Sequence, residues 1–350
     1  MLSVTDSNVT CPMGVRPLSV RPLLHPVVGV YDLYLRVAVT IAGSVGNGMS
    51  LVVLARYNRR DHWIVAYFIA FTAIDFIYLF LVGTISWLKT GLDLASNGTL
   101  SVDVLRGDAR VCEVWYVLKW TLIHCMAWTV ALGSAARAFF TKHSRTWPVR
   151  RKYAMPAIAA CGLAVASPFL YAIPVYKRCT CVDELFVFTR PTAVLTILGL
   201  AVALPCLIAV VSNMVTIALS LRCDPMSAAL ASMGGMLTTK RRTDQRYTAA
   251  FLLWSTVYCS CAVSMAVCWT IYATSGHQAA LDAPTPLDHE RALMGNACLV
   301  TMRVLELRCA LNFPIFCVVL PYFRLEVCNV FASGCDRSRL TRTRNSIMLF

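Results

Sequence analysis

The stretch from residue 63 to residue 89 reads WIVAYFIAFTAIDFIYLFLVGTISWLK. Before its closing Lys89, the stretch carries a single charged side chain, Asp75. A helix needs about 20 mainly apolar residues to cross the hydrocarbon core of a bilayer. The stretch therefore predicts a transmembrane helix, and an acid at that depth marks a position of functional interest.

Six further segments have similar length and composition. The seven predicted spans cover residues 28–55, 63–89, 110–140, 152–176, 191–221, 247–273 and 293–320. The 350 residues are 58% hydrophobic and 14% charged, and their mean hydropathy is +0.63. Because seven spans leave no room for a large soluble domain, the predicted fold class is an all-α membrane protein, a seven-transmembrane helix bundle.

The basic residues predict the orientation of these spans. With the N-terminus outside, eighteen Lys and Arg residues fall in cytoplasmic loops and tail, nine in outer segments and five within spans. This bias follows the positive-inside rule. The net charge of +14 is therefore attributed to topology and to contact with the lipid bilayer, and not to nucleic acid. Glycosylation sequons at Asn8 and Asn97 both lie outside in this topology.

Cysteines near the membrane surface suggest two kinds of modification. Cys112 begins the third span on the outer side, and Cys179 and Cys181 lie in the second outer loop. An oxidising compartment permits a disulfide there. Cys328 and Cys335 follow the last span, which is a common setting for palmitoylation. Unmodified thiols are the alternative at these two positions.

Landmark residues follow one another in order along the spans. They are Gly46-Asn47, the run from Tyr67 to Asp75, Cys112, Arg137 twenty-five residues later, Pro205, and Asn312-Phe313-Pro314-Ile315-Phe316 followed by Phe323-Arg324. In this order and spacing, about residues 28–332 resemble the rhodopsin-like (class A) G-protein-coupled receptors. The Asn-Phe pair of span 7 and the run Ser255–Tyr258 are most similar to invertebrate neuropeptide receptors.

The resemblance implies a layout and a set of partners. An extracellular N-terminus, the receptor domain, a short amphipathic eighth helix parallel to the membrane and a cytoplasmic tail would occupy residues 1–27, 28–320, 321–332 and 333–350. It also implies a disulfide between Cys112 and Cys181 or Cys179. The implied partners are an extracellular ligand, a heterotrimeric G protein and arrestin. The implied location is the plasma membrane, and no cofactor is expected.

Several positions depart from the family pattern. Ala136 and Ala138 replace the acid and the tyrosine beside Arg137, Phe316 replaces the tyrosine of span 7, and span 6 lacks the Cys-Trp-x-Pro kink. In relatives, the acid helps to hold the resting state, so its loss favours active states. Ala138 and Phe316 remove partners of the active state as well. Constitutive signalling and silence therefore both stay open, and a membrane-edge anchor is the structural alternative for Arg137.

Ionisable residues inside spans are costly and normally find partners within the bundle. The family's packing would place Lys119 of span 3 opposite Glu306 of span 7, across the floor of the ligand pocket. We expect a salt bridge between them, which is either opened by a charged ligand or purely structural. Other expected pocket residues are Arg303 and the aromatic residues near the outer mouth, Trp87, Trp115 and Tyr116.

Asp75 corresponds to the acid that holds a sodium ion in many relatives. Arg308 lies four residues before Asn312, where relatives place another member of that ion site. We predict that the Arg308 guanidinium pairs with Asp75, supplies the positive charge internally and excludes sodium. In the alternative, Arg308 points elsewhere and Asp75 binds an ion. Together with Arg137 and Phe316, these residues form the predicted activation set.

The resemblance implies the function of a receptor, and the sequence shows no metal cluster and no nucleophile–histidine pair that would indicate an enzyme. A peptide ligand is expected, because the outer loop from Lys177 to Glu184 offers both charges and Lys119 stands where an amine receptor needs an aspartate. A transporter would require repeats and broken helices that the sequence lacks, and a retinal protein would require a lysine in span 7. The alternative is a non-coupling receptor, namely a scavenger, decoy or heterodimer partner with eroded activation motifs.

Overall fold

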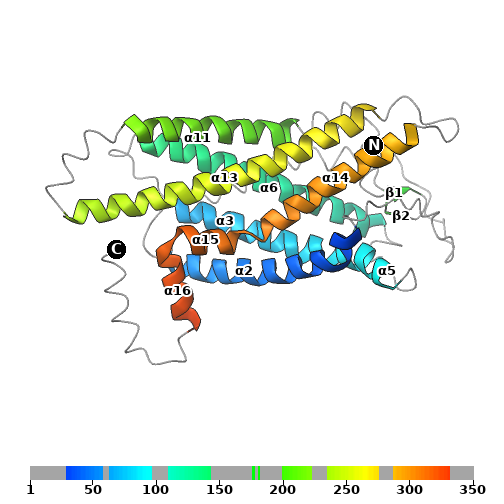
Figure 1. Ribbon diagram of the computed structural model, residues 1–350, viewed down its shortest axis with the longest axis horizontal. Coiled ribbons are helices and arrows are strands. Elements are labelled where there is room, and N and C mark those ends of the chain that lie inside the picture. The colour runs from blue at the N-terminus through cyan, green and yellow to red at the C-terminus, as the bar shows by residue number, and fades with distance from the viewer. Residues whose placement is uncertain are drawn as a thin grey trace.

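The computed structural model describes residues 29–57, 63–96, 109–142, 176–177, 180–181, 199–222, 235–275 and 287–331. Long helices that run along one common axis dominate this part of the chain (Figure 1). The predicted span 152–176 lies outside the described residues except for its last residue, and so do residues 1–28 and 332–350.

The first three predicted spans are helical along their described lengths. The first is a π-helical turn, Tyr31–Leu35, that continues into α2 (Arg36–Tyr57). The second is one continuous helical path. It begins with α3 (Trp63–Ile77) and a π-helical stretch (Tyr78–Gly83), continues through α4 (Thr84–Ser86) and a second π-helical stretch (Trp87–Gly91), and ends with α5 (Leu92–Ala95). The third is α6 (Ala109–Lys142).

The remaining described elements are helices and one small hairpin. A π-helical turn at Gly199–Ala203 leads into α11 (Leu204–Arg222). The other helices are α13 (Gly235–Ser275), α14 (Leu287–Cys309), α15 (Asn312–Val319) and α16 (Pro321–Phe331). The strands β1 (Tyr176–Lys177) and β2 (Thr180–Cys181) pair antiparallel, with Tyr176 opposite Cys181. The hairpin and α5 lie at one end of the bundle, and α16 crosses its other end (Figure 1).

Four helical paths are long and apolar enough to cross a membrane, at Tyr31–Arg56, Ile64–Gly91, Leu118–Thr141 and Gln245–Ile271. The pair of α15 and α16 meets the same criteria together, with a bend of 113° between its halves. The apolar part of α11, Leu204–Ser220, is shorter. The described chain is therefore helical, with several helices that could cross a membrane, as in a multi-pass membrane protein.

The structure revises one predicted span and extends another. The segment 293–320 is not one helix, because α14 ends at Cys309 and α15 begins at Asn312. The intervening turn is closed by hydrogen bonds from the Ala310 and Leu311 amides to carbonyls three residues earlier. The predicted span 247–273 is part of a longer helix, because α13 begins at Gly235 and ends at Ser275.

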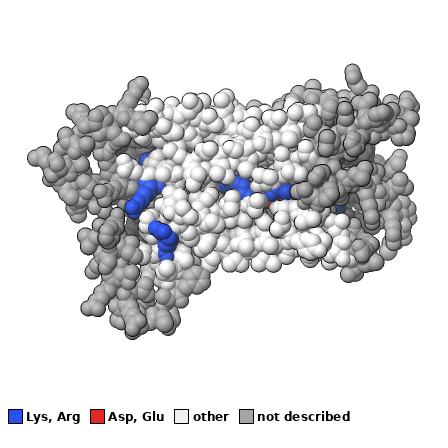
Figure 2. Space-filling view, viewed as in Figure 1, with Lys and Arg blue, Asp and Glu red and all other residues white. Residues whose placement is uncertain are grey.

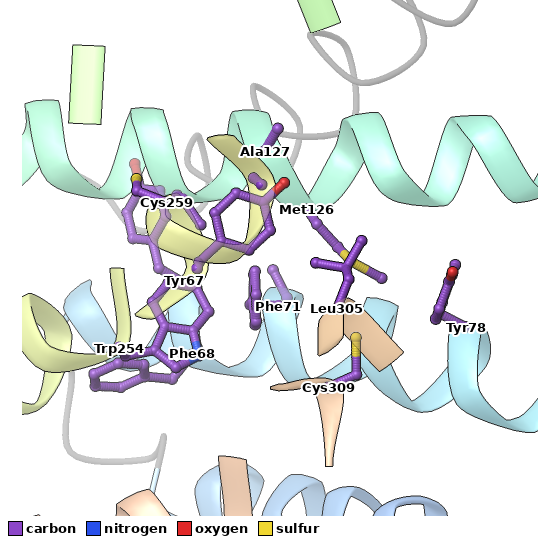
Figure 3. Packing of buried hydrophobic residues seen from close by; sticks show 14 of the residues in the cluster. Tyr67, Phe68, Phe71, Tyr78, Met126, Ala127, Trp254, Cys259, Leu305 and Cys309 are labelled. Carbon is purple, nitrogen blue, oxygen red and sulfur yellow. The ribbon is translucent and has the colours of Figure 1, made fainter. Parts of the chain in front are cut away.

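An aromatic cluster fills the centre of the bundle. Phe71 of α3 meets Trp254 of α13 edge-on, with 3.6 Å between ring centroids, and Phe68 lies 5.1 Å from Phe316 of α15. Figure 3 shows Phe68, Phe71 and Trp254 gathered beside α6. All four side chains are at most 1% exposed. This packing fixes α3, α13 and α15 around the buried polar residues.

The surface of the described bundle is mainly uncharged, with a few Lys and Arg side chains (Figure 2). Large apolar side chains are exposed along α2 and α11, for example Ile41 at 61%, Leu207 at 60% and Met214 at 66%. Exposed apolar faces of this extent are unusual for a soluble monomer and suit a lipid environment.

Candidate functional site

Four charged side chains, three of them buried and one partly buried, gather where the first helical path meets α14. This four-charge cluster consists of Asp32, Arg36, Arg303 and Glu306. Arg36 lies 3.0 Å from Asp32 and 3.0 Å from Glu306, while Arg303 lies 2.9 Å from Asp32 and 3.0 Å from Glu306. Each guanidinium therefore contacts both carboxylates, and the cluster is neutral.

Neighbouring polar groups complete the cluster. Arg36 Nε and Nη2 donate to the two oxygens of Glu306, at 3.2 and 3.0 Å, and Nη1 donates to Thr90 Oγ1 at 3.1 Å. The Tyr31 hydroxyl donates to Glu306 Oε2 at 3.3 Å. Thr90 donates its own proton to the Ser86 carbonyl, which leaves its oxygen free to accept from Arg36. Such additional hydrogen bonds are what a buried ion pair needs to offset its desolvation.

Helical spacing explains how these charges meet. Asp32 and Arg36 are four residues apart on one helical path, and Arg303 and Glu306 are three apart on α14, so each pair lies on one helix face. The two faces oppose each other across the bundle. The side chain of Arg303 is 15% exposed, whereas those of Asp32, Arg36 and Glu306 are at most 3% exposed. Arg303 is therefore the most exposed member of the cluster.

The prediction of a salt bridge between Lys119 and Glu306 is wrong, because Glu306 has other partners. Both oxygens of Glu306 are engaged by Arg36, Arg303 and Tyr31, and no bridge to Lys119 occurs among the ion pairs of the described ranges. Lys119 is buried, at 4% exposure, and has interactions of its own. The sequence pattern does not show that Arg36, on the first helical path, lies buried within reach of Glu306.

A second buried network lies further along α14. We call it the central network, and its members are Asn47, Asp75, Trp254, Arg308 and Asn312. Arg308 Nη1 lies 3.0 Å from both oxygens of Asp75, which confirms the predicted pairing. The Asn312 amide nitrogen donates to Asp75 Oδ2 at 2.7 Å and to Asn47 Oδ1 at 3.1 Å. Trp254 Nε1 donates to Asn312 Oδ1 at 3.0 Å.

This network joins five helices, α2, α3, α13, α14 and α15. Asn47 belongs to α2 and also donates to the Cys309 carbonyl at 3.0 Å, which is one of the last carbonyls of α14. Asp75 belongs to α3 and Trp254 to α13. All five members are at most 2% exposed. The bond from Trp254 to Asn312 ties α13 to α15, so a movement of α13 away from α15 would break it.

Aromatic rings surround the Arg308 guanidinium. Its central carbon lies 4.0 Å from the Phe71 ring centroid, 5.2 Å from that of Tyr258 and 5.3 Å from that of Trp254. Ring faces attract a cation, and the attraction is stronger where water is excluded. Arg308 Nη2 makes no hydrogen bond. The charge of Asp75 is thus balanced by one internal cation held by a carboxylate and three rings.

Arg137 lies near the C-terminal end of α6 and contacts α13. Its guanidinium donates to the Thr248 hydroxyl of α13, and its side chain is half-buried. This contact links α6 to α13 although Ala136 offers no acid. The membrane-edge reading of Arg137 accounts for the half-exposure but not for this interhelical hydrogen bond.

The other predicted site residues fall into two groups, those with described side chains and those without. Trp87 and Trp115 are half-buried, and Trp115 packs against the core. Phe316 lies in the aromatic cluster, and Cys328 is an exposed free thiol on α16. The side chains of Tyr116, Cys112 and Cys181 lie outside the described residues, as do Cys179, Asn8, Asn97 and Cys335 entirely.

The sequence analysis missed several network members. Asp32 and Arg36 carried a signal, because an acid and a base four residues apart within an apolar run indicate a paired, inward face. Trp254 and Thr248 carried no sequence signal that distinguishes them from ordinary core and helix-end residues. Within the described ranges, no group of three or more His, Cys, Asp or Glu side chains could hold a metal ion.

Comparison with known proteins does not assign the chain. No protein-family model matches the sequence, and no curated protein gives a significant match.

Proposed function

We propose that this chain is a cell-surface receptor of the rhodopsin-like type, with seven transmembrane helices and a short eighth helix parallel to the membrane. In this proposal, the N-terminus is extracellular, the ends of α5 and the hairpin face outward, and α16 lies at the cytoplasmic surface of the plasma membrane. The expected ligand is a peptide, and the expected partners are a heterotrimeric G protein and arrestin.

The observation that carries the proposal is the placement of two polar networks along α14. The four-charge cluster lies near the proposed outer end and has one partly exposed member, Arg303. The central network begins two residues after Glu306, at Arg308, and reaches Asn312 of α15. A ligand that changes the ion pairs of Arg303 would therefore act on the helix that also positions Arg308.

A charged peptide fits the chemistry of the cluster. Its two guanidinium groups and two carboxylates form a closed set of pairs, so a ligand carboxylate could take Arg303 from Asp32, and a ligand amine could take Asp32 from Arg303. A ligand shifts a conformational equilibrium only through such differential contacts between two states. The proposed response is a displacement of α13, which both Trp254 and Thr248 connect to neighbouring helices.

A non-coupling receptor is the second candidate, and one observation favours it. Arg137 donates to Thr248 within the bundle, so the side chain that relatives use to engage a G protein is already committed to α13. In that case, the chain would bind a ligand as a scavenger, decoy or heterodimer partner without activating a G protein.

A peptide-library screen on surface-expressed full-length chain separates these functions. Arrestin recruitment and G-protein activation are read side by side, and each active peptide is tested again on Arg303→Gln. The proposal expects a signal from the wild-type chain that weakens at least about fivefold in Arg303→Gln, as for loss of one charged hydrogen bond. Peptide binding without either signal would support the non-coupling function. Absence of binding by any peptide class would contradict the proposed ligand.

A further inference from the structure

An apolar groove lies between α2 and α16. It encloses a cavity of about 230 Å³. Its lining contains no hydrogen-bonding side chain and consists of Gly48, Met49, Val52, Val53, Val327 and Val330. A groove of this composition holds a hydrocarbon ligand more favourably than water.

Gly48 lines the groove and has room for a side chain. A Cβ atom added at Gly48 would meet only Phe76 Cε2, at 3.7 Å, which is ordinary van der Waals contact. A larger side chain can therefore be placed at this lining position without a backbone clash at its Cβ. By contrast, a Cβ added at Gly43 on the same helix would lie 2.5 Å from Leu79 and 2.8 Å from Ala310.

One edge of the groove on α2 is directed outward. Val52 is 47% exposed, whereas Val53, which also lines the groove, is 1% exposed. In a bilayer, this edge meets lipid tails, because exposed apolar side chains of a membrane helix contact hydrocarbon. The groove is thus accessible to lipid from the side.

Each of the two helices that form the groove carries an exposed arginine within one turn of a lining residue. Arg56 lies four residues after Val52 and three after Val53, on the same side of α2. Arg324 lies three residues before Val327, on the same side of α16. Both arginine side chains are exposed. An apolar cavity bordered by two cations matches a molecule with a hydrocarbon chain and an anionic head.

We propose that the groove between α2 and α16 binds one anionic phospholipid of the leaflet that faces α16. One acyl chain occupies the cavity, and the phosphate group contacts Arg56 and Arg324. Guanidinium groups bind phosphate with paired hydrogen bonds, and basic side chains at a membrane surface favour anionic lipid. This site is independent of the proposed ligand and of G-protein coupling, since it requires only membrane insertion.

The competing occupant is an acyl chain attached to Cys328. Cys328 is exposed and follows Val327 directly, so it lies about 100° around α16 from that groove-lining residue. Cys328 is four residues after Arg324, so its thiol lies on the side of that arginine and not between the lining residues Val327 and Val330. We assign the groove to the phospholipid and treat thioacylation as an outcome of the test.

Native mass spectrometry of the purified full-length chain tests the site. The chain is extracted from bilayers that contain equal amounts of phosphatidylserine and phosphatidylcholine, and retained lipids are counted. The wild-type chain should retain one phosphatidylserine in preference to phosphatidylcholine. Arg56→Gln and Arg324→Gln should each reduce that preference about fivefold, whereas Gly48→Leu should abolish retention of either lipid.

Matched variants provide the controls. Arg246→Gln makes the same charge change at an exposed position of α13, and Val45→Leu enlarges an apolar residue of α2 that does not line the groove; both should retain the lipid. Thermal unfolding of Gly48→Leu verifies that it is folded. Equal retention of both lipids by the wild-type chain, or an equal loss in Arg246→Gln, would overturn the proposal. An acyl mass that persists under denaturing conditions and disappears in Cys328→Ser would assign the groove to thioacylation.

Discussion

The two polar networks along α14 both neutralise buried carboxylates, but they do so with different groups. The four-charge cluster balances two carboxylates with two guanidinium groups and leaves Arg303 15% exposed. The central network balances Asp75 with the single cation Arg308 and completes it with two asparagine side chains, an indole and ring faces, all at most 2% exposed. A molecule from solvent can exchange partners with the first network. The second can change only when helices move.

The comparison predicts that the central network is the less tolerant of a missing charge. Asp75→Ala would leave the Arg308 cation buried without a carboxylate, and breaking a buried pair in this way costs about 3–5 kcal/mol. Unfolding of the purified chain in detergent, followed by circular dichroism, measures the loss. The double variant Asp75→Ala with Arg308→Met should recover most of it. A single variant within about 1 kcal/mol of wild type would contradict the internal pairing.

Within the four-charge cluster, burial should separate two arginines that contact the same carboxylates. Arg36→Met should destabilise the chain by about 1.5–3 kcal/mol, because it removes charged hydrogen bonds to Glu306 and Thr90. Arg303→Met should cost about 1 kcal/mol or less, since water can replace it. Chemical unfolding of the two variants compares them directly. Equal losses would mean that Arg303 is no more accessible than Arg36.

A smaller effect tests the link between the central network and α13. Trp254→Phe keeps the aromatic packing but removes the donor to Asn312, so we expect a loss of about 1–2 kcal/mol from an unsatisfied buried oxygen. Trp128→Phe is the matched control, because the indole nitrogen of Trp128 makes no hydrogen bond with any described residue. If both variants lose equal stability in the same unfolding assay, the bond to Asn312 contributes nothing.

The smallest expected effect concerns sodium. Arg308 already supplies the positive charge beside Asp75, so replacing sodium chloride by N-methylglucamine chloride at equal ionic strength should leave the unfolding temperature unchanged. The alternative, in which Asp75 binds an ion, predicts a rise in that temperature with sodium that follows ligand linkage. Potassium chloride controls for cation effects that are not specific to sodium.

The sequence predicted the helical membrane class and the pairing of Arg308 with Asp75, and it failed at the partners of Glu306. The first success came from composition, and the second from one acid and one base at matching depths on two spans. Glu306 has several bases at similar depth, and only the tertiary arrangement selects Arg36 and Arg303 over Lys119. The break between α14 and α15 was also hidden, because the apolar pattern continues through Ala310 and Leu311.

The measurement that tests the account most directly is ligand-free G-protein activation in cells that express the chain at the surface. Wild type is compared with Arg137→Ala and Thr248→Val at matched expression. Thr248→Val removes the hydroxyl that accepts from Arg137, and loss of one such bond of about 1 kcal/mol should raise basal signalling about fivefold. Arg137→Ala should abolish that signalling. Silence of all three chains, with surface expression intact, would contradict G-protein coupling as the function.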